Sequence, residues 1–142
     1  MNHAVPHVLI VDDHPDMLGV LDQLMKSAGY ETELANSGVD ALERAHTDTP
    51  DLILLDWMMP GMDGLQVLAH LRAAPMTAKT PVVVISAKGP EEGNKAIRAG
   101  ATAYWPKGSV DAEELIRIAD VVTSNRVHGK ILRADIPGKQ RP

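Results

Sequence analysis

A chain of 142 residues and 15.3 kDa has the size of one compact domain, and its 44% hydrophobic residues exclude a disordered or low-complexity protein. The absence of cysteine excludes a disulfide framework, a thiol nucleophile and a thiolate metal site. The net charge of −5 disfavours direct binding to nucleic acid, because an acidic body repels the phosphate backbone.

The charge is uneven along the chain, and this asymmetry indicates a boundary near residue 124. The segment 125–142 is basic, with Arg126, Lys130, Arg133, Lys139 and Arg141 against Asp135 alone. We therefore expect one domain over residues 1–124 and a basic tail or linker over residues 125–142. No signal-peptide pattern is present and no apolar run approaches the roughly 20 residues that span a bilayer, which predicts a soluble cytoplasmic protein without membrane contact.

Apolar runs and helical patterns alternate regularly along the chain. In chain order, the first half predicts a strand over 7–12, a helix from Pro15 that stops at Gly29, a strand over 30–35, a helix that opens at 36–38 and ends before 48–50, and a strand over 52–56. The second half predicts a helix that carries the apolar residues of 65–71, a strand over 81–86, a helix over 91–99, a strand over 101–105 and a helix from 110 to about 122.

This alternation is typical of a doubly wound α/β fold with a five-stranded parallel sheet. Most strands are continuous apolar runs, as expected when helices cover both faces. The acids Glu31 and Glu33 alternate along the second strand and indicate an edge position. Periodicity leaves the strand order open between the flavodoxin-like 2-1-3-4-5 and half of a Rossmann fold, but in both the ligands bind at the carboxyl ends of the strands.

The residues at those strand ends are polar and of complementary charge. They are Asp12 and Asp13 at the end of the first strand, Asp56 at the end of the third, Ser86 at the end of the fourth and Lys107 after the fifth. Each has an ordinary alternative role as a helix cap, a turn residue or a surface charge. Converging carboxylates repel one another unless a cation neutralises them, and a site built of carboxylate oxygens favours Mg²⁺. A lysine and a hydroxyl beside such a cation would suit the oxygens of a phosphoryl group.

Two segments carry a resemblance to a known family. Residues 8–15 read Val-Leu-Ile-Val-Asp-Asp-His-Pro, and residues 56–64 read Asp-Trp-Met-Met-Pro-Gly-Met-Asp-Gly. With Ser86-Ala87 and with Gly100-Ala101 followed by Tyr104 and Lys107, the chain over about residues 7–123 resembles the receiver domain of two-component response regulators, as in the chemotaxis regulators. The resemblance implies a flavodoxin-like (βα)5 fold with the strand order 2-1-3-4-5.

The resemblance also implies a role for each strand-end residue. Asp56 would accept a phosphoryl group from a histidine kinase or a histidine phosphotransfer protein. Asp13, Asp56 and the backbone carbonyl of Met58 would hold Mg²⁺, and Asp12 would act through a metal-bound water. Lys107 and Ser86 would each contact a phosphoryl oxygen. Catalysis would be limited to the chain's own phosphorylation and dephosphorylation, so the protein is a switch and not an enzyme with a separate substrate.

The output expected from the resemblance lies on one face. Ser86 and Tyr104 would switch, and the face made by the fourth helix, the fifth strand and the fifth helix would change. One departure is visible, because Pro106 precedes Lys107 where the family usually has proline after the lysine. This order predicts an altered path for the following loop, with consequences for the reach of Lys107.

Two alternatives compete with the switch. The first is a receiver-like interaction module that no longer accepts phosphate. The second is a phosphatase with an aspartyl nucleophile, which usually needs a second acid at the place that Met58 occupies. The expected partners are a phosphodonor protein and either a downstream protein target or an output domain, with no direct nucleic-acid contact by this domain. A monomer and a phosphorylation-dependent dimer are both compatible with the sequence.

Overall fold

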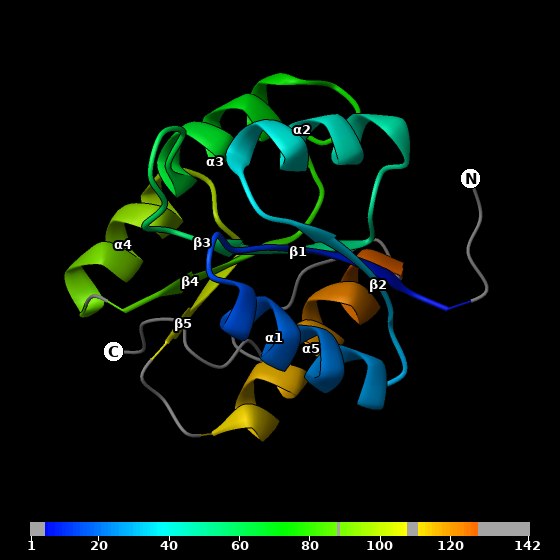
Figure 1. The fold of residues 1–142 in the computed structure, drawn as a ribbon. Coiled ribbons are helices and arrows are strands. Elements are labelled where there is room, and N and C mark those ends of the chain that lie inside the picture. The colour runs from blue at the N-terminus through cyan, green and yellow to red at the C-terminus, as the bar shows by residue number, and fades with distance from the viewer. Residues whose placement is uncertain (1–4, 88, 108–110, 128–142) are drawn as a thin grey trace.

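The computed structural model describes residues 5–87, 89–107 and 111–127, which form a parallel sheet with helices on both faces (Figure 1). The strands are β1 (His7–Val11), β2 (Glu31–Ala35), β3 (Leu52–Asp56), β4 (Val82–Ser86) and β5 (Ala103–Pro106). The helices are α1 (Pro15–Ser27), α2 (Gly38–Thr47), α3 (Gly64–Ala73), α4 (Pro90–Arg98) and α5 (Ala112–Val127).

The strand order is β2-β1-β3-β4-β5, and every neighbouring pair is parallel. This order confirms the flavodoxin-like (βα)5 fold and excludes the Rossmann alternative. The second strand lies at an edge, as its acids Glu31 and Glu33 predicted. The third strand is central, so a residue at its carboxyl end has a strand on each side.

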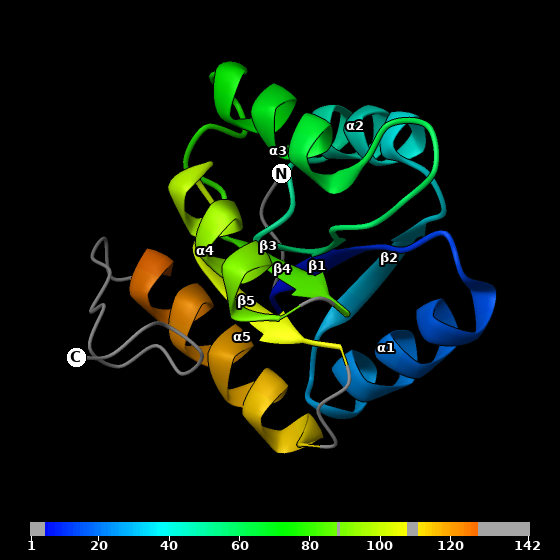
Figure 2. The same cartoon turned by 90° about the vertical axis from the view of Figure 1, so that its left-hand side faces the viewer.

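The helices form two layers. The helices α1 and α5 cover one face of the sheet, and α2, α3 and α4 cover the other, as the two views show (Figures 1 and 2). Along β1, Val8 and Ile10 pack toward α1 and α5, whereas Leu9 and Val11 pack toward the opposite layer. Because both faces are covered, β1, β3 and β4 are buried throughout, which explains their continuous apolar sequences.

Local signals in the sequence explain where the helices begin. The Ser37 side chain accepts a hydrogen bond from the Asp40 amide at the start of α2. Asp63 and Gln66 form a reciprocal capping box at the start of α3. Both α1 and α4 begin with proline, at Pro15 and Pro90, where a missing amide proton breaks no helical bond. Among the described residues, no helix has the length and apolar character of a membrane span.

The fifth strand differs from its predicted range of 101–105. It begins at Ala103. The Ala101 amide donates a hydrogen bond to the carbonyl of Ala96, so Ala101 belongs to the turn that follows α4 and not to the strand. It also includes Pro106, which an edge strand tolerates because one side of it needs no amide donor.

The last helix extends further than the predicted residue 122 and crosses the boundary expected at residue 124. Before and at the start of this extension, the Tyr30 hydroxyl lies 2.7 Å from Asp120 Oδ1 and 3.3 Å from Thr123 Oγ1. Burial raises the pKa of Tyr30 above its ordinary value. Residues 128–142 lie outside the described part of the chain, so the division into a domain and a basic tail stays a prediction.

Candidate functional site

Parallel register brings the acids that follow β1 and end β3 to one edge of the sheet. Val11 of β1 pairs with Leu55 of β3, so the residues that follow this pair along the two segments are Asp12 and Asp56. Asp12 is 0% exposed and Asp56 is 2% exposed. Asp13 follows in the loop before α1, and one carboxylate oxygen from each of the three acids lies within 4.8 Å of the others. The structure therefore confirms that these acids converge.

The same edge receives Ser86 and Lys107 from the other side of β3. Ser86 ends β4 and pairs with Pro106, and the Lys107 amide donates a 2.7 Å hydrogen bond to the Ser86 carbonyl. The Lys107 ammonium nitrogen lies 3.1 Å from Asp12 Oδ2 and 3.5 Å from Asp56 Oδ1. Lys107 thus reaches the acids with proline before it, while the loop at 108–110 lies outside the described residues.

The environment of Asp56 opposes its ionisation. Burial raises the pKa of Asp56 to about 6, and the negative charge of Asp12 acts in the same direction. The ammonium of Lys107 and a 3.3 Å hydrogen bond from the Met58 amide act against this rise. Near neutral pH, Asp56 is therefore mainly ionised, with a carboxylate less stabilised than one in water.

The donor set fits a hard divalent cation. Asp56 Oδ2 is buried and receives no hydrogen bond from any residue in the described part of the chain. Buried carboxylate oxygens without donors are unfavourable unless a cation approaches them, and a cluster of oxygen ligands selects Mg²⁺ over softer metals. Asp12 Oδ1 also accepts a 2.9 Å hydrogen bond from the His14 amide, so this acid additionally serves as a turn residue.

His14 belongs to the same cluster, although it is not among the Mg²⁺ ligands predicted from the sequence. Its Nδ1 atom lies 3.4 Å from Asp12 Oδ1 and 3.3 Å from Asp13 Oδ1. Its side chain is 67% exposed, which places it at the rim of the site. Its position directly after the acidic pair was the available signal, but the direction of the ring depends on the turn that Asp12 makes.

The sequence also did not predict a contact between α4 and the loop over residues 57–63, which follows the predicted acceptor Asp56 and is called the acceptor loop below. The Trp57 indole Nε1 donates a 2.9 Å hydrogen bond to Glu92 Oε1, which links the residue after Asp56 to the first turn of α4. The Trp57 ring packs against Gly64, where a Cβ atom would lie 2.7 Å from Trp57 Cα. Glycine at the first position of α3 therefore permits the close approach of this helix to the backbone of Asp56 and Trp57.

The two remaining predicted residues lie in the loop after β3 and in β5. Met58 follows Trp57 in the acceptor loop and its side chain is exposed, while the role of its carbonyl as a ligand stays a prediction. Tyr104 lies in β5 and is half-buried, with its ring packed in the layer of α2, α3 and α4. The structure brings Asp12, Asp56 and Lys107 into contact and places Ser86 beside them.

The sequence of this chain matches the model of the response regulator receiver domain over residues 8–120. The chain belongs to this family. Its receiver domain is 35% identical to the transcriptional regulatory protein PrrA of Mycobacterium tuberculosis, over 95% of this chain and 61% of that protein. It is 36% identical to a gliding motility regulatory protein of Myxococcus xanthus, over 82% of this chain and 15% of that protein. The chain thus spans only part of these relatives.

Solved receiver structures agree with the fold. The chemotaxis protein CheY4 of Vibrio cholerae superposes with a TM-score of 0.78 at 29% identity, covering 84% of this chain and 99% of that one. The receiver domain of a Pseudomonas aeruginosa sensor histidine kinase, solved with a magnesium ion in its active-site cleft, superposes with a TM-score of 0.79 at 26% identity, covering 85% and 99%. This receiver domain is therefore a module of two-component signalling.

Proposed function

We propose that this receiver domain is a phosphorylation-activated switch that accepts a phosphoryl group on Asp56 in the presence of Mg²⁺. The observation that carries the proposal is the position of Asp56 at the end of the central strand, with Asp12 beside it and the Lys107 ammonium 3.5 Å away. The donor would be a phosphohistidine of a histidine kinase or of a histidine phosphotransfer protein.

The transfer requires little from the protein beyond position and charge. An oxygen of ionised Asp56 attacks phosphorus, the bond between phosphorus and the donor imidazole breaks, and the imidazole takes a proton from solvent. Lys107 supplies a positive charge for the phosphoryl oxygens, and the Ser86 hydroxyl donates a hydrogen bond to one of them. Asp13, Asp56 and the Met58 carbonyl would hold the cation, with Asp12 acting through water.

The magnesium ion, when bound, neutralises the converging negative charge of the acids and the phosphoryl group. Asp56 Oδ2, which has no hydrogen-bond partner among the described residues, and the magnesium ion in the active-site cleft of the Pseudomonas structure support this part of the proposal. The raised pKa of Asp56 fits it too, because a carboxylate that burial has destabilised gains more from an adjacent cation than a solvated one does.

The readout that we propose is a change in the face made by α4, β5 and α5. Ser86 and Tyr104 would rearrange when the phosphoryl group arrives, and a protein target or an output domain would read the new surface. The longer relatives PrrA and PhoB, named as transcriptional regulators, support a function upstream of an output. The cytoplasmic location and the choice between monomer and phosphorylation-dependent dimer stay predictions.

Intact-mass analysis after incubation with acetyl phosphate and Mg²⁺ tests the proposal. We expect the native chain to gain one phosphoryl group and Asp56→Asn to gain none. Asp51→Asn is the matched control, because Asp51 precedes the same strand at its opposite end, and it should still be phosphorylated. If the native chain gains nothing, the proposal fails in favour of an interaction module, and rapid hydrolysis of unrelated phosphoesters would instead indicate a phosphatase.

A further inference from the structure

The Tyr104 ring lies directly against the backbone of α4 at Gly93. A Cβ atom at position 93 would be closer than 3.0 Å to three carbon atoms of this ring, Cδ2, Cε2 and Cζ. Real Cβ atoms do not approach other atoms so closely, so no residue with a side chain is compatible with this ring position. Gly93 is buried and its next neighbour on the same helix face, Ala96, is small and fully buried.

A glycine in the interior of a short helix is unfavourable for the helix itself. Glycine loses more backbone freedom on folding than alanine does, and α4 contains only nine residues. Position 93 has no left-handed backbone angle that would require glycine. The close approach of the Tyr104 ring is therefore the structural reason for glycine at this position.

We propose that Gly93 is a positioning residue for the switch, because its missing side chain is what admits the Tyr104 ring between β5 and α4. We call this ring position the seated orientation. The inference rests on the proposed function, in which Tyr104 takes part in switching. A side chain at position 93 forces the Tyr104 ring out of the seated orientation or pushes α4 away from the sheet.

Glu92, which precedes Gly93 in α4, connects the position of the Tyr104 ring to the acceptor loop. Glu92 accepts the hydrogen bond from the Trp57 indole, and Trp57 directly follows Asp56. Two consecutive residues of α4 therefore contact the acceptor loop and the Tyr104 ring. If the seated ring and the phosphorylated Asp56 favour the same α4 position, each must stabilise the other by the same free energy.

The test compares two helical glycines that differ in the space around them. Gly93→Ala adds a methyl group against the Tyr104 ring, whereas Gly19→Ala in α1 adds one that, apart from its chain neighbours and its own helix backbone, meets no described atom within 4 Å. The first readout is nuclear magnetic resonance of the ring-labelled, unphosphorylated protein, in which the seated ring gives Overhauser contacts to the Gly93 α-protons. The second is the rate at which acetyl phosphate with Mg²⁺ phosphorylates Asp56.

We expect Gly93→Ala to shift the Tyr104 ring signals, to remove these contacts and to slow phosphorylation about tenfold, equivalent to about 1.4 kcal/mol in the barrier. We expect Gly19→Ala to leave the ring signals and the rate unchanged. Unchanged ring signals in Gly93→Ala would overturn the inference. A native chain that is not phosphorylated at all would overturn the proposed function instead, because the ring signals do not depend on it.

A second background separates the clash from a general loss of structure. In Tyr104→Ala, position 93 has no ring to exclude, so adding Gly93→Ala should change neither the rate nor the fold. If Gly93→Ala alone fails to fold and the double variant folds, the conflict with the ring is confirmed. If Gly93→Ala slows phosphorylation equally in both backgrounds, or if the double variant also fails to fold, the inference is wrong.

Discussion

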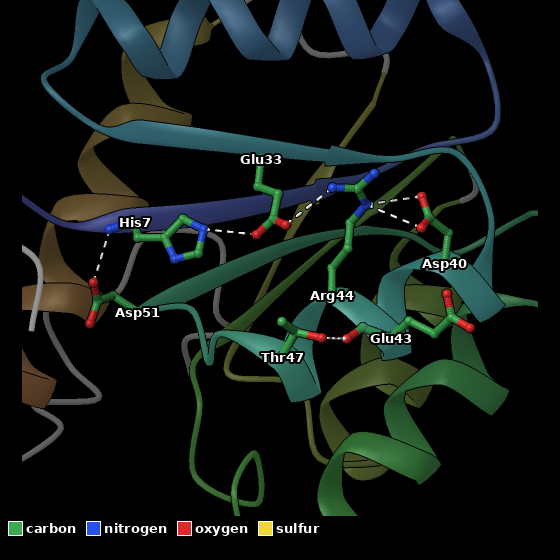
Figure 3. Close-up of polar contacts among 7 residues, drawn as sticks. All are labelled: His7, Glu33, Asp40, Glu43, Arg44, Thr47 and Asp51. Carbon is green, nitrogen blue, oxygen red and sulfur yellow. Dashed lines mark hydrogen bonds and ion pairs between the residues drawn. The ribbon is translucent and has the colours of Figure 1, made fainter. Parts of the chain in front are cut away.

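The carboxyl edge of the sheet and the region around the start of β1 both gather charged side chains, but they satisfy them differently. Near the start of β1, His7 Nε2 lies 3.0 Å from Glu33, and Arg44 bonds both Glu33 and Asp40 at 3.1 Å (Figure 3). These four side chains, which we call the His7–Asp40 network, give both Glu33 and Asp40 a hydrogen-bond donor. At the carboxyl edge, three acids share one ammonium group and one exposed imidazole.

The difference separates stability from function. The His7–Asp40 network connects β1, β2 and α2 through hydrogen bonds, and the bonds from Arg44 to Asp40 and Glu33 raise the pKa of Arg44 above its ordinary value. The carboxyl edge keeps an oxygen of buried Asp56 without a hydrogen-bond partner among the described residues, which disfavours folding until a cation arrives. The carboxyl edge is therefore suited to binding a cation, whereas the His7–Asp40 network is suited to stabilising the fold.

Replacing Asp56 should change the free energy of unfolding more than any other substitution considered for the two regions. Its folded-state pKa of about 6 lies above its ordinary value of 3.8, so the folded protein holds this proton more tightly than the unfolded chain. That stabilisation is complete below about pH 4 and is lost as the pH rises through about 6. At about pH 7 without Mg²⁺, Asp56→Asn should therefore raise the free energy of unfolding by about 3 kcal/mol.

Urea unfolding in the presence of a chelator measures this gain. The difference between Asp56→Asn and the native chain should shrink toward zero as the pH falls to about 4. Asp40→Asn is the control from the His7–Asp40 network, and it should give no gain, because Asp40 already accepts hydrogen bonds from Arg44. A gain at Asp40 equal to that at Asp56 would contradict the contrast between the two regions.

A second effect concerns magnesium affinity. Asp13→Asn removes one carboxylate from the cluster while leaving Asp12 and Asp56 in place. We expect Mg²⁺ to bind at least about tenfold more weakly, because ligand charge dominates the affinity of oxygen sites for hard cations. Calorimetric titration with MgCl₂ checks it, with Asp16→Asn in the first turn of α1 as an unaffected control. Equal affinities of the two variants would exclude Asp13 as a ligand.

Loss of Arg44 from the His7–Asp40 network should have only a small effect on stability. Arg44→Ala leaves Glu33 and Asp40 without their guanidinium partner. Because these side chains are partly exposed, the expected loss is only about 0.5–1 kcal/mol of unfolding free energy. Mg²⁺ affinity and phosphorylation by acetyl phosphate should be unchanged. A phosphorylation rate that falls together with stability would show that the network also acts on the carboxyl edge.

Much of this architecture could be predicted from the sequence because each strand end carries its own signal. Asp12 and Asp56 each follow a run of buried apolar residues, and parallel strands bring such positions to one edge. The family motif then decided the strand order, which periodicity had left open. The start of β5 was predicted two residues early, because the Ala101 amide bonds back to Ala96 and this contact leaves no mark in a hydropathy pattern.

The parts that could not be predicted depend on side chains meeting across the fold. Trp57 and Glu92 are 35 residues apart in sequence, and nothing in either segment indicates the other. The sequence shows Gly93 only as a glycine inside a predicted helix, and the reason for it depends on the Tyr104 ring that packs against it. His14 was visible next to the acids, but its ring direction depends on the Asp12 turn.

The central claim is that Asp56 itself becomes the acyl phosphate, and trapping that bond tests it most directly. Borohydride reduces an acyl phosphate of aspartate to the alcohol homoserine, which peptide mass mapping locates in the chain. After acetyl phosphate and Mg²⁺, the account predicts homoserine at position 56 alone, and none when a chelator replaces Mg²⁺. Homoserine at Asp12 or Asp13, or its formation at position 56 without any divalent cation, would contradict the account.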